Sequence, residues 1–387
     1  MFAALLISFQ LLLALKASPV GHAGEYTTGR CFTTYAYPSQ PIHNGTDLSQ
    51  LDWKASLQCA LVERENDDTQ EAMRFLNITA QSLLRMQVDD LERSRFLSRT
   101  ALFHGEPETL RKVSLHLQWN ATTITDVFLG RTNMHGQADK DVVLANTDVS
   151  SLFRHQGLQS RISIHLQLDS SAATPNASIL FTYPLGYGIF SDIDDTLRQS
   201  HVSDQLKLLQ STFLDPWTPV PGMPELFRHL QTTLATGSTP PTTTYVSVSP
   251  WQLIDHLKGF TESYYAVGEL MLAPFAFYSP TAFMRMNDPT HYKMDRFEQL
   301  HARFPLKRWY LLGDSSQHDP EIYAKIYEKY GDKAVACIWI VMAPDTDGKQ
   351  NEVGRFEKAF AKVPVERWQA FQDPTALLSL PAGQCRP

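Results

Sequence analysis

The stretch Phe190-Ser191-Asp192-Ile193-Asp194-Asp195-Thr196 decides the fold class, because an apolar strand runs directly into three carboxylates. In an open α/β sheet, ligands bind just beyond the carboxyl ends of the strands. Side chains two apart on an extended segment point the same way, so Asp192 and Asp194 are expected to face one ligand. Like charges this close are unfavourable unless a cation lies between them, and a hard ion such as Mg²⁺ is the natural neutraliser.

Three further pieces follow along the chain. The apolar run Trp309–Leu312 leads into Gly313 and Asp314, where the glycine permits a sharp turn. Asp314 is expected to complete the metal shell, and Asp319 to support it. The strand-like segment Tyr245–Pro250 ends in hydroxyls, and Lys293 begins a helical stretch that leads into the Asp314 strand.

The pattern around these pieces predicts an α/β domain over residues 186–387. Short apolar runs alternate with helical stretches, which is typical of a doubly wound fold with a parallel sheet. The predicted strands are Tyr187–Phe190, Thr243–Val248, Trp309–Leu312 and Ala334–Met342. The predicted helices are Pro224–Leu234, Trp251–Phe260, Tyr292–Phe304 and Pro320–Tyr330.

Two other regions precede this domain. Over residues 109–185 apolar and polar residues alternate, as in Val113, Leu115 and Leu117, which predicts a small β-sandwich-like domain. Over residues 24–108 the apolar residues recur at helical spacing, which predicts a helical N-terminal region that caps the next domain. The residues that suggest this spacing are Leu51, Leu57, Ala60 and Leu61, then Ala72, Phe75, Leu76, Ala80, Leu83 and Leu84.

The N-terminus predicts a signal peptide over residues 1–23. The apolar run Ala3–Leu15 is shorter than the ~20 residues that a spanning helix needs, and the segment before Ala23 suits cleavage. An uncleaved anchor is the alternative. Four N-glycosylation sequons agree with a secreted protein or a protein of the secretory-pathway lumen. These sequons begin at Asn44, Asn77, Asn120 and Asn176.

Four cysteines suit two disulfides in an oxidising compartment. Proximity along the chain favours the pairs Cys31–Cys59 and Cys337–Cys385, and the other two pairings remain open. The net charge of −7 argues against a nucleic-acid partner, which would require a basic surface. No protein partner can be inferred from the sequence.

The ordered pieces resemble the signature of the haloacid dehalogenase (HAD) superfamily of phosphotransferases. That signature has an Asp-x-Asp-x-Thr motif, a strand that ends in Ser or Thr, a Lys, and a Gly-Asp pair followed by a further Asp. The matching residues in this chain are Asp192, Asp194, Thr196, Ser247, Lys293, Asp314 and Asp319. The resemblance implies a HAD-like catalytic domain.

A narrower resemblance is to the actin-patch-associated phosphatidate phosphatases, relatives of the lipins, over about residues 186–375. It is carried by Ser191–Thr196, Pro221–Leu226, Tyr245–Leu253 and Gly313–Tyr323. The chain departs from that family after Gly268, where an Arg is missing, and in Trp339–Ala343, which lacks an Arg-Asp pair. Substrate contacts are therefore expected to differ.

This resemblance implies a two-step displacement. Asp192 attacks phosphorus and forms an aspartyl-phosphate. Asp194 protonates the leaving oxygen and then accepts a proton from the hydrolytic water. The carboxylates of Asp192 and Asp314, with the Asp194 backbone carbonyl, are expected to hold Mg²⁺, while Ser247 and Lys293 bind the phosphoryl oxygens.

Several neighbouring residues could have either a functional or a purely structural role. Asp195 is expected to form surface or backbone hydrogen bonds rather than to join the site, and Thr196 to cap the following turn. Ser247 is preferred to Ser249 because of its place on the strand. The histidines at 291 and 318 are expected to be structural. Trp217 and the segment Ala273–Met286 contact either lipid or the protein core.

The expected function is Mg²⁺-dependent hydrolysis of phosphatidate, or its lyso form, to diacylglycerol and phosphate. The phospholipid substrate would be bound at a membrane surface. One alternative is a phosphatase for a soluble phosphomonoester. The other is a secreted glycosylated binding protein with an inactive phosphatase fold.

Overall fold

The computed structural model describes residues 25–387, except residues 44, 66–86, 157–160, 168–176, 274–288, 345 and 347. The predicted signal peptide lies outside the described residues, and so do the sequon asparagines Asn44, Asn77 and Asn176. The same holds for nearly all of the segment Ala273–Met286. Among the described helices, none has the length and the apolar character that crossing a membrane requires.

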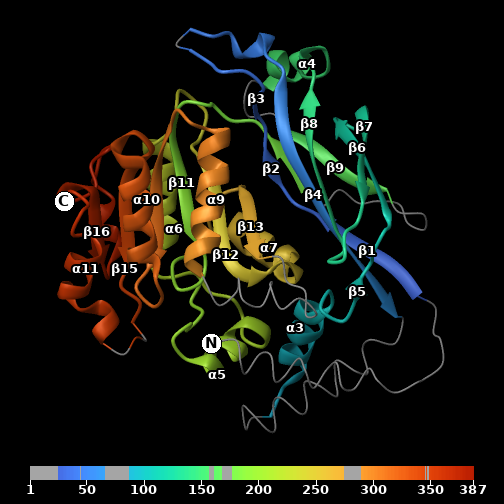
Figure 1. The fold of residues 1–387 in the computed structure, drawn as a ribbon. Coiled ribbons are helices and arrows are strands. Elements are labelled where there is room, and N and C mark those ends of the chain that lie inside the picture. Colours follow the sequence, from blue (N-terminus) through green and yellow to red (C-terminus); the bar gives the residue numbers. More distant parts are fainter. Residues whose placement is uncertain are drawn as a thin grey trace.

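A six-stranded parallel sheet forms the C-terminal part of the molecule (Figure 1). The strand order is β13-β12-β11-β14-β15-β16, so the two halves of the sheet run outward from the central pair β11 and β14. The predicted strands are confirmed, and β13 and β16 were not predicted. The strands are β11 (Gly186–Asp192), β12 (Thr242–Pro250), β13 (Glu269–Ala273), β14 (Lys307–Asp314), β15 (Val335–Val341) and β16 (Trp368–Phe371).

Helices cover both faces of this sheet. Neighbouring strand residues enter different hydrophobic clusters: Ile189 packs with α6 and α7, whereas Phe190 packs with α9 and α10. This alternation follows from the period of two along a strand. The four predicted helices are confirmed. The helices of this part are α5 (Gln205–Phe213), α6 (Met223–Thr233), α7 (Ile254–Tyr264), α9 (Pro289–Arg303), α10 (Asp319–Ala334) and α11 (Val353–Ala359).

The N-terminal half contains two five-stranded sheets. Their inner side chains form one hydrophobic cluster, in which Trp53, Leu57 and Leu61 of one sheet accompany Leu115 and Ile164 of the other. The first sheet has β1 (Glu25–Cys31), β3 (Tyr37–Pro38), β4 (Trp53–Glu65), β5 (Glu106–Pro107) and β8 (Gln137–Leu144). The second has β2 (Thr34–Tyr35), β6 (Lys112–Trp119), β7 (Thr122–Arg131), β9 (Arg161–Gln167) and β10 (Ala177–Leu180).

The helical prediction for residues 24–108 is wrong where the chain forms β1 and β4. In β4, Ala55, Leu57 and Cys59 are buried and alternate with the less buried Ser56 and Gln58, which is the period of a strand. The helix-like spacing of its leucines masked this period. Within the region, α3 (Asp90–Thr100) is helical. The residues from 72 to 84 that suggested a further helix lie outside the described chain, and the domain bounds remain predictions.

Two disulfides form as predicted. Cys31 and Cys59 are directly opposed on β1 and β4. Cys337 of β15 binds Cys385, which fastens the C-terminal segment to the parallel sheet. The Trp339 indole also donates a hydrogen bond to the Cys385 carbonyl at 2.9 Å.

A buried ion pair connects the two halves of the molecule. Arg303 of α9 binds Glu269 of β13 through two bonds of 2.8 Å, and the Thr34 hydroxyl of β2 donates to Glu269 at 3.0 Å. The Arg303 and Glu269 side chains are only 9% and 8% exposed. The pair itself lies within the C-terminal half, and its hydrogen bonds with Thr34 link it to the N-terminal sheets.

Replacing Arg303 by Leu should destabilise the protein strongly. Glu269 would remain as a buried charge without its partner, which costs about 3–5 kcal/mol of unfolding free energy. Urea denaturation would measure the change. Lys329→Leu is the matched control, because Lys329 forms an exposed pair with Glu298 and its loss should affect stability far less. Equal effects of the two substitutions would contradict this prediction.

Candidate active site

Three carboxylates meet at the carboxyl edge of the parallel sheet. Asp192 ends β11, Asp314 ends the neighbouring β14, and Asp319 is the first residue of α10. Each offers an oxygen, and these oxygens all lie within 4.8 Å of one another. All three residues are buried. We call Asp192, Asp314 and Asp319 the carboxylate trio. Two distant stretches of sequence therefore converge, because β11 and β14 are adjacent and parallel.

Lys293 reaches the trio from α9. Its ammonium group lies 2.8 Å from Asp192 Oδ1 and also contacts Asp319 Oδ1. The side chain is only 2% exposed. Burial alone would lower the pKa of Lys293, but the charges of Asp192 and Asp319 outweigh it and raise that pKa. The lysine is therefore a fixed positive charge at the site.

One ammonium group does not balance three carboxylates. Burial raises the pKa of Asp192 to about 7, although Lys293 opposes the shift. Burial, and then the charges of Asp319 and Asp192, raise the pKa of Asp314 well above its usual range. Uncompensated negative charge and hard oxygen donors suit a divalent cation. The trio thus fits a metal site.

Gly313 allows α10 to approach the end of β14. A Cβ at this position would come within 2.7 Å of Asp319 Cβ and of Tyr323 Cε2, and it would also strike the Asp319 carboxylate. That carboxylate accepts a hydrogen bond from the Asp314 backbone N–H at 3.3 Å. The absence of a side chain at Gly313 therefore sets the distance between two members of the trio.

Gly313→Ala should disrupt the site. The new methyl group would push Asp319 away from Asp314 and Lys293, and overpacking of this kind costs about 1–3 kcal/mol. We expect a large loss of catalytic activity together with a lower melting temperature. Gly354→Ala on α11 is the control, because a Cβ there meets open space. If Gly313→Ala retained full activity, the close approach would not matter.

Thr196 contacts the trio directly. Its hydroxyl lies 3.3 Å from Asp192 Oδ2 and 3.5 Å from Asp314 Oδ2, and the residue is fully buried. The prediction of a turn cap missed this role. Ser316 was also missed: its backbone N–H donates to Asp314 Oδ1 at 2.6 Å. The Asp-x-Asp-x-Thr spacing signalled the first of these, whereas nothing in the sequence signalled Ser316.

The Asp194 side chain lies apart from the trio. It accepts hydrogen bonds from Arg198 at 2.5 Å, Ser200 at 2.7 Å, Ser249 at 3.0 Å and Ser247 at 3.1 Å. Burial would raise the pKa of Asp194, but Arg198 and the hydroxyl donors outweigh burial and lower it. Asp194 is thus held as a carboxylate. Both serines reach it, so the structure does not separate Ser247 from Ser249.

The remaining candidates lie outside the trio. The Asp195 carboxylate accepts hydrogen bonds from the backbone N–H groups of Ser200, His201 and Val202 at 2.7, 2.8 and 2.7 Å. This agrees with the backbone interpretation of Asp195. The two candidate histidines, His291 and His318, are exposed and are not members of the trio. Trp217 is half-buried and packs beside the main core, as its core interpretation predicted.

A comparison with known families identifies the class of this domain. Residues 187–341, less than half of the chain, match the family described as phosphatidate phosphatase APP1, catalytic domain. This family defines a class of phosphoric monoester hydrolases. The matching part of the chain contains the trio and is similar to that phosphatidate phosphatase catalytic domain.

A curated relative agrees with this assignment. The chain is 26% identical over 205 residues to phosphatidate phosphatase APP1 of Saccharomyces cerevisiae. The match covers 51% of this chain and 32% of the yeast protein, so the chain spans about a third of that relative. A solved carbohydrate esterase structure superposes over 89% of this chain and 88% of its own, with 7% identity and a TM-score of 0.19, which carries no argument about the fold.

Proposed function

We propose that this protein is a Mg²⁺-dependent phosphatase that hydrolyses phosphatidate or lysophosphatidate. One observation supports this above the others: a buried carboxylate trio with a single lysine lies at the carboxyl edge of β11 and β14. This is where an α/β sheet binds ligands. We further propose that the sheet and its helices form a doubly wound HAD-like domain, which the strand order supports.

In the proposed reaction, Asp192 is the nucleophile. One of its carboxylate oxygens bonds to phosphorus while the bond from phosphorus to the ester oxygen breaks. Lys293 stays beside Asp192 and binds the phosphoryl oxygens, where negative charge accumulates. Ser247 would be a further phosphoryl ligand, and its hydroxyl donates to Asp194 Oδ2 at 3.1 Å.

Asp194 would handle the protons in both steps. A phosphomonoester brings negative charge beside Asp194, and a like charge favours its protonated form. The acid then protonates the leaving alkoxide. In the second step the carboxylate accepts a proton from water as that water attacks phosphorus, which releases phosphate and restores Asp192. The lowered pKa of Asp194 keeps it ionised, which is the form that can accept this proton.

The trio would hold Mg²⁺ through Asp192, Asp314 and Asp319, with the Asp194 backbone carbonyl as a further ligand. When bound, the ion would neutralise charge on the phosphoryl oxygens. Oxygen donors favour Mg²⁺ over softer metals. Thr196 and Ser316 orient the carboxylates of this site by hydrogen bonding.

A small cavity beside the site supports an apolar leaving group. Its volume is about 160 Å³. One wall is apolar, and the rest of the lining is polar: Val220, Pro221, Val341, Ala343 and Pro344 against Asp195, Gln199, His201 and Ser203. Ser315, the neighbour of Asp314, links this wall to the site: its backbone N–H donates to the Val341 carbonyl, and its hydroxyl accepts from the Ala343 N–H, both at 2.9 Å. The apolar side of this cavity would accept the hydrocarbon part of an ester alcohol, and its polar side would accept the hydroxyl or ester oxygens next to the phosphate.

The function is tested by phosphate release from a panel of esters, with and without Mg²⁺. We expect Mg²⁺-dependent release from phosphatidate and lysophosphatidate in micelles, and weak release from a sugar phosphate. A strong preference for the sugar phosphate would favour a phosphatase for soluble substrates. Absence of release from every ester would favour a binding protein with an inactive fold.

The secretory route is part of the proposal. The two disulfides fit an oxidising compartment. Asn120 lies in an exposed turn between β6 and β7, where its side chain is accessible to glycosylation. Mass spectrometry of the protein from its own cells would detect the glycan and the first residue of the mature chain.

A further inference from the structure

A buried arginine that was not among the predicted site residues forms an ion pair with Asp194. Arg198 is 1% exposed, and its guanidinium group lies 2.5 Å and 3.2 Å from Asp194 Oδ1 through two different nitrogens. Two contacts from one planar group fix direction as well as distance. The same guanidinium approaches the Ser211 carbonyl at 3.4 Å and the Thr212 hydroxyl at 3.5 Å. It is therefore anchored on both sides.

Trp217 holds this arginine through its ring. The Arg198 guanidinium carbon lies 4.5 Å from the centroid of the indole ring, which is cation–π distance. The indole N–H donates to the Thr212 carbonyl at 3.2 Å, so the ring itself is fixed. A second guanidinium, that of Arg99, lies 4.7 Å from the same ring. One indole thus contacts two arginines.

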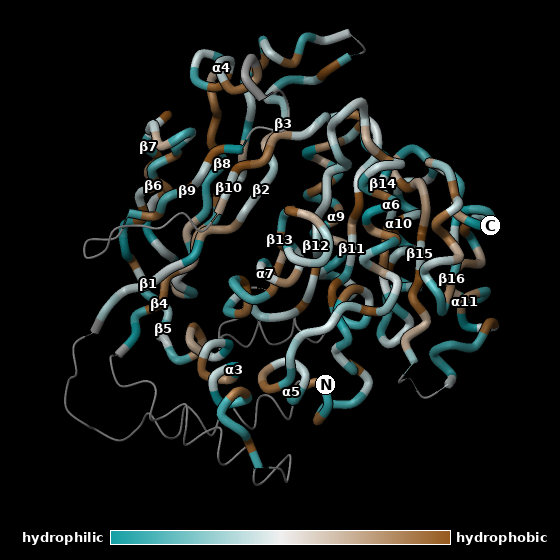
Figure 2. The backbone as a smooth tube through the Cα atoms, turned by 180° about the vertical axis from the view of Figure 1, so that it is seen from behind, coloured by the Kyte–Doolittle hydropathy of each residue, from teal (hydrophilic) through white to brown (hydrophobic). Residues whose placement is uncertain are grey.

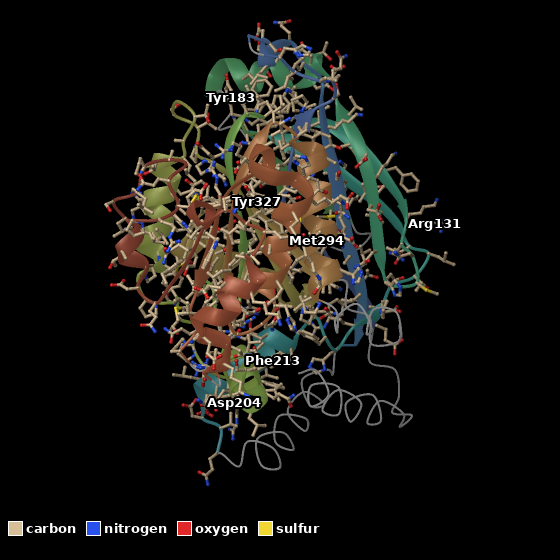
Figure 3. All side chains as sticks on the ribbon, turned by 60° about the vertical axis from the view of Figure 1, so that its left-hand side comes forward. Arg131, Tyr183, Asp204, Phe213, Met294 and Tyr327 are labelled. Carbon is tan, nitrogen blue, oxygen red and sulfur yellow. A yellow bond between two sulfur atoms is a disulfide. The ribbon has the colours of Figure 1, made fainter. Side chains whose placement is uncertain are left out.

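Arg99 comes from the N-terminal half of the chain, on α3. It donates to the carbonyls of Thr212 and Asp215 at 3.0 and 2.7 Å. Helix α3 also packs on the end of α5: the rings of Phe96 in α3 and of Phe103, just after α3, lie 6.1 and 6.0 Å from the Phe213 ring. Figures 1 and 2 show α3 beside α5, and Figure 3 labels Phe213. This packing keeps Arg99 at the indole.

Two buried guanidinium groups this close repel each other. Carbonyl oxygens, the indole and the Asp194 carboxylate surround them and offset this repulsion. Asp194 is the carboxylate that pairs with Arg198. The arrangement therefore connects α3 to Asp194 by a continuous series of contacts from Arg99 through Trp217 to Arg198.

We propose that Arg198 is a positioning residue that holds the carboxylate of Asp194 beside the Ser247 hydroxyl. Trp217 and Arg99 keep Arg198 in place, so the N-terminal half contributes to the site. This inference rests on the proposed function, because Asp194 is there the group that protonates the leaving oxygen. A group that is misplaced by even a small distance transfers a proton poorly.

The test compares two phosphate esters whose leaving groups differ in how much they require protonation. Dodecyl phosphate releases an alkoxide, which must be protonated as it leaves. para-Octylphenyl phosphate releases a phenolate, a far weaker base that leaves with little help. Both esters carry a hydrocarbon tail. Turnover of each is measured for the full-length wild type and for Arg198→Gln, Arg198→Lys, Trp217→Leu and Arg93→Gln. Arg93, on the exposed side of α3, is the matched control.

We expect Arg198→Gln to lower turnover of the alkyl ester by about 10²-fold or more, because a positioned acid contributes about 10²–10⁴-fold. The loss on the aryl ester should be at least about tenfold smaller. Arg198→Lys should recover part of the alkyl activity, Trp217→Leu should shift the ratio in the same direction, and Arg93→Gln should change neither rate.

Equal losses on the two esters, or none, would overturn the inference, since a purely structural arginine affects both alike. If Arg198→Gln does not fold, judged by circular dichroism, the ratio for Trp217→Leu decides in the same way. The proposed function fails separately, when the wild type releases phosphate from neither ester, and the inference falls with it.

Discussion

Asp192→Asn should abolish phosphate release while leaving the fold intact. Asparagine keeps the shape of the side chain but cannot attack phosphorus, so the covalent route is lost. Loss of a nucleophile in other hydrolases costs about 10⁶-fold in kcat, and we expect turnover to fall to the background of the assay. Phosphate release from lysophosphatidate micelles in Mg²⁺ would measure it.

Stability should change little or improve in this variant without metal. Burial and the neighbouring carboxylates already raise the pKa of Asp192 to about 7, so the neutral amide removes one of three crowded charges. Asp126→Asn, at an exposed position on β7, controls for the chemistry of the change. Full activity of Asp192→Asn would exclude Asp192 as the nucleophile and remove the basis of the proposed reaction.

Lys293→Met should cause the second-largest effect. Methionine has a similar length and keeps the packing of α9, but it removes the positive charge 2.8 Å from Asp192. Loss of one donor that stabilises developing charge costs about 10²–10³ in kcat. Steady-state kinetics with lysophosphatidate would give the loss, which we expect mainly in kcat rather than in KM.

The same substitution should also affect stability in a metal-dependent way. Without the ammonium group, the buried trio has lost its paired cation, which costs about 3–5 kcal/mol of unfolding free energy. Mg²⁺ should restore more stability to Lys293→Met than to the wild type, as measured by melting temperature. Lys325→Met, at an exposed position on α10, is the control. An identical Mg²⁺ response in wild type and variant would contradict the charge argument.

The parallel sheet could be predicted because its signals are local. Each buried strand is a short apolar run, and each covering helix repeats apolar residues at helical spacing. The prediction for β4 was wrong because a local signal can be ambiguous. Its leucines fit both the helical and the strand period, and only the position of β4 between two other strands selects the extended form. Strand β16 was missed because Trp368–Phe371 is short and mixed in character.

The sequence by itself determined the chemical groups of the site and their order. Asp192, Asp194 and Asp314 could be proposed because they follow apolar runs, and Lys293 because it begins a helical stretch before the Asp314 strand and matches the HAD signature. The two disulfide pairs also followed from spacing along the chain. These features depend on residues that are close along the chain, so they can be predicted from the sequence alone.

Only the tertiary structure decided what surrounds each group. Arg198, Trp217 and Arg99 meet because α3 packs on α5, although Arg99 lies far from the other two along the chain. Gly313 matters because α10 begins against the end of β14. Contacts of this kind depend on distances between elements, which are set by packing of the whole core and are not contained in any local pattern.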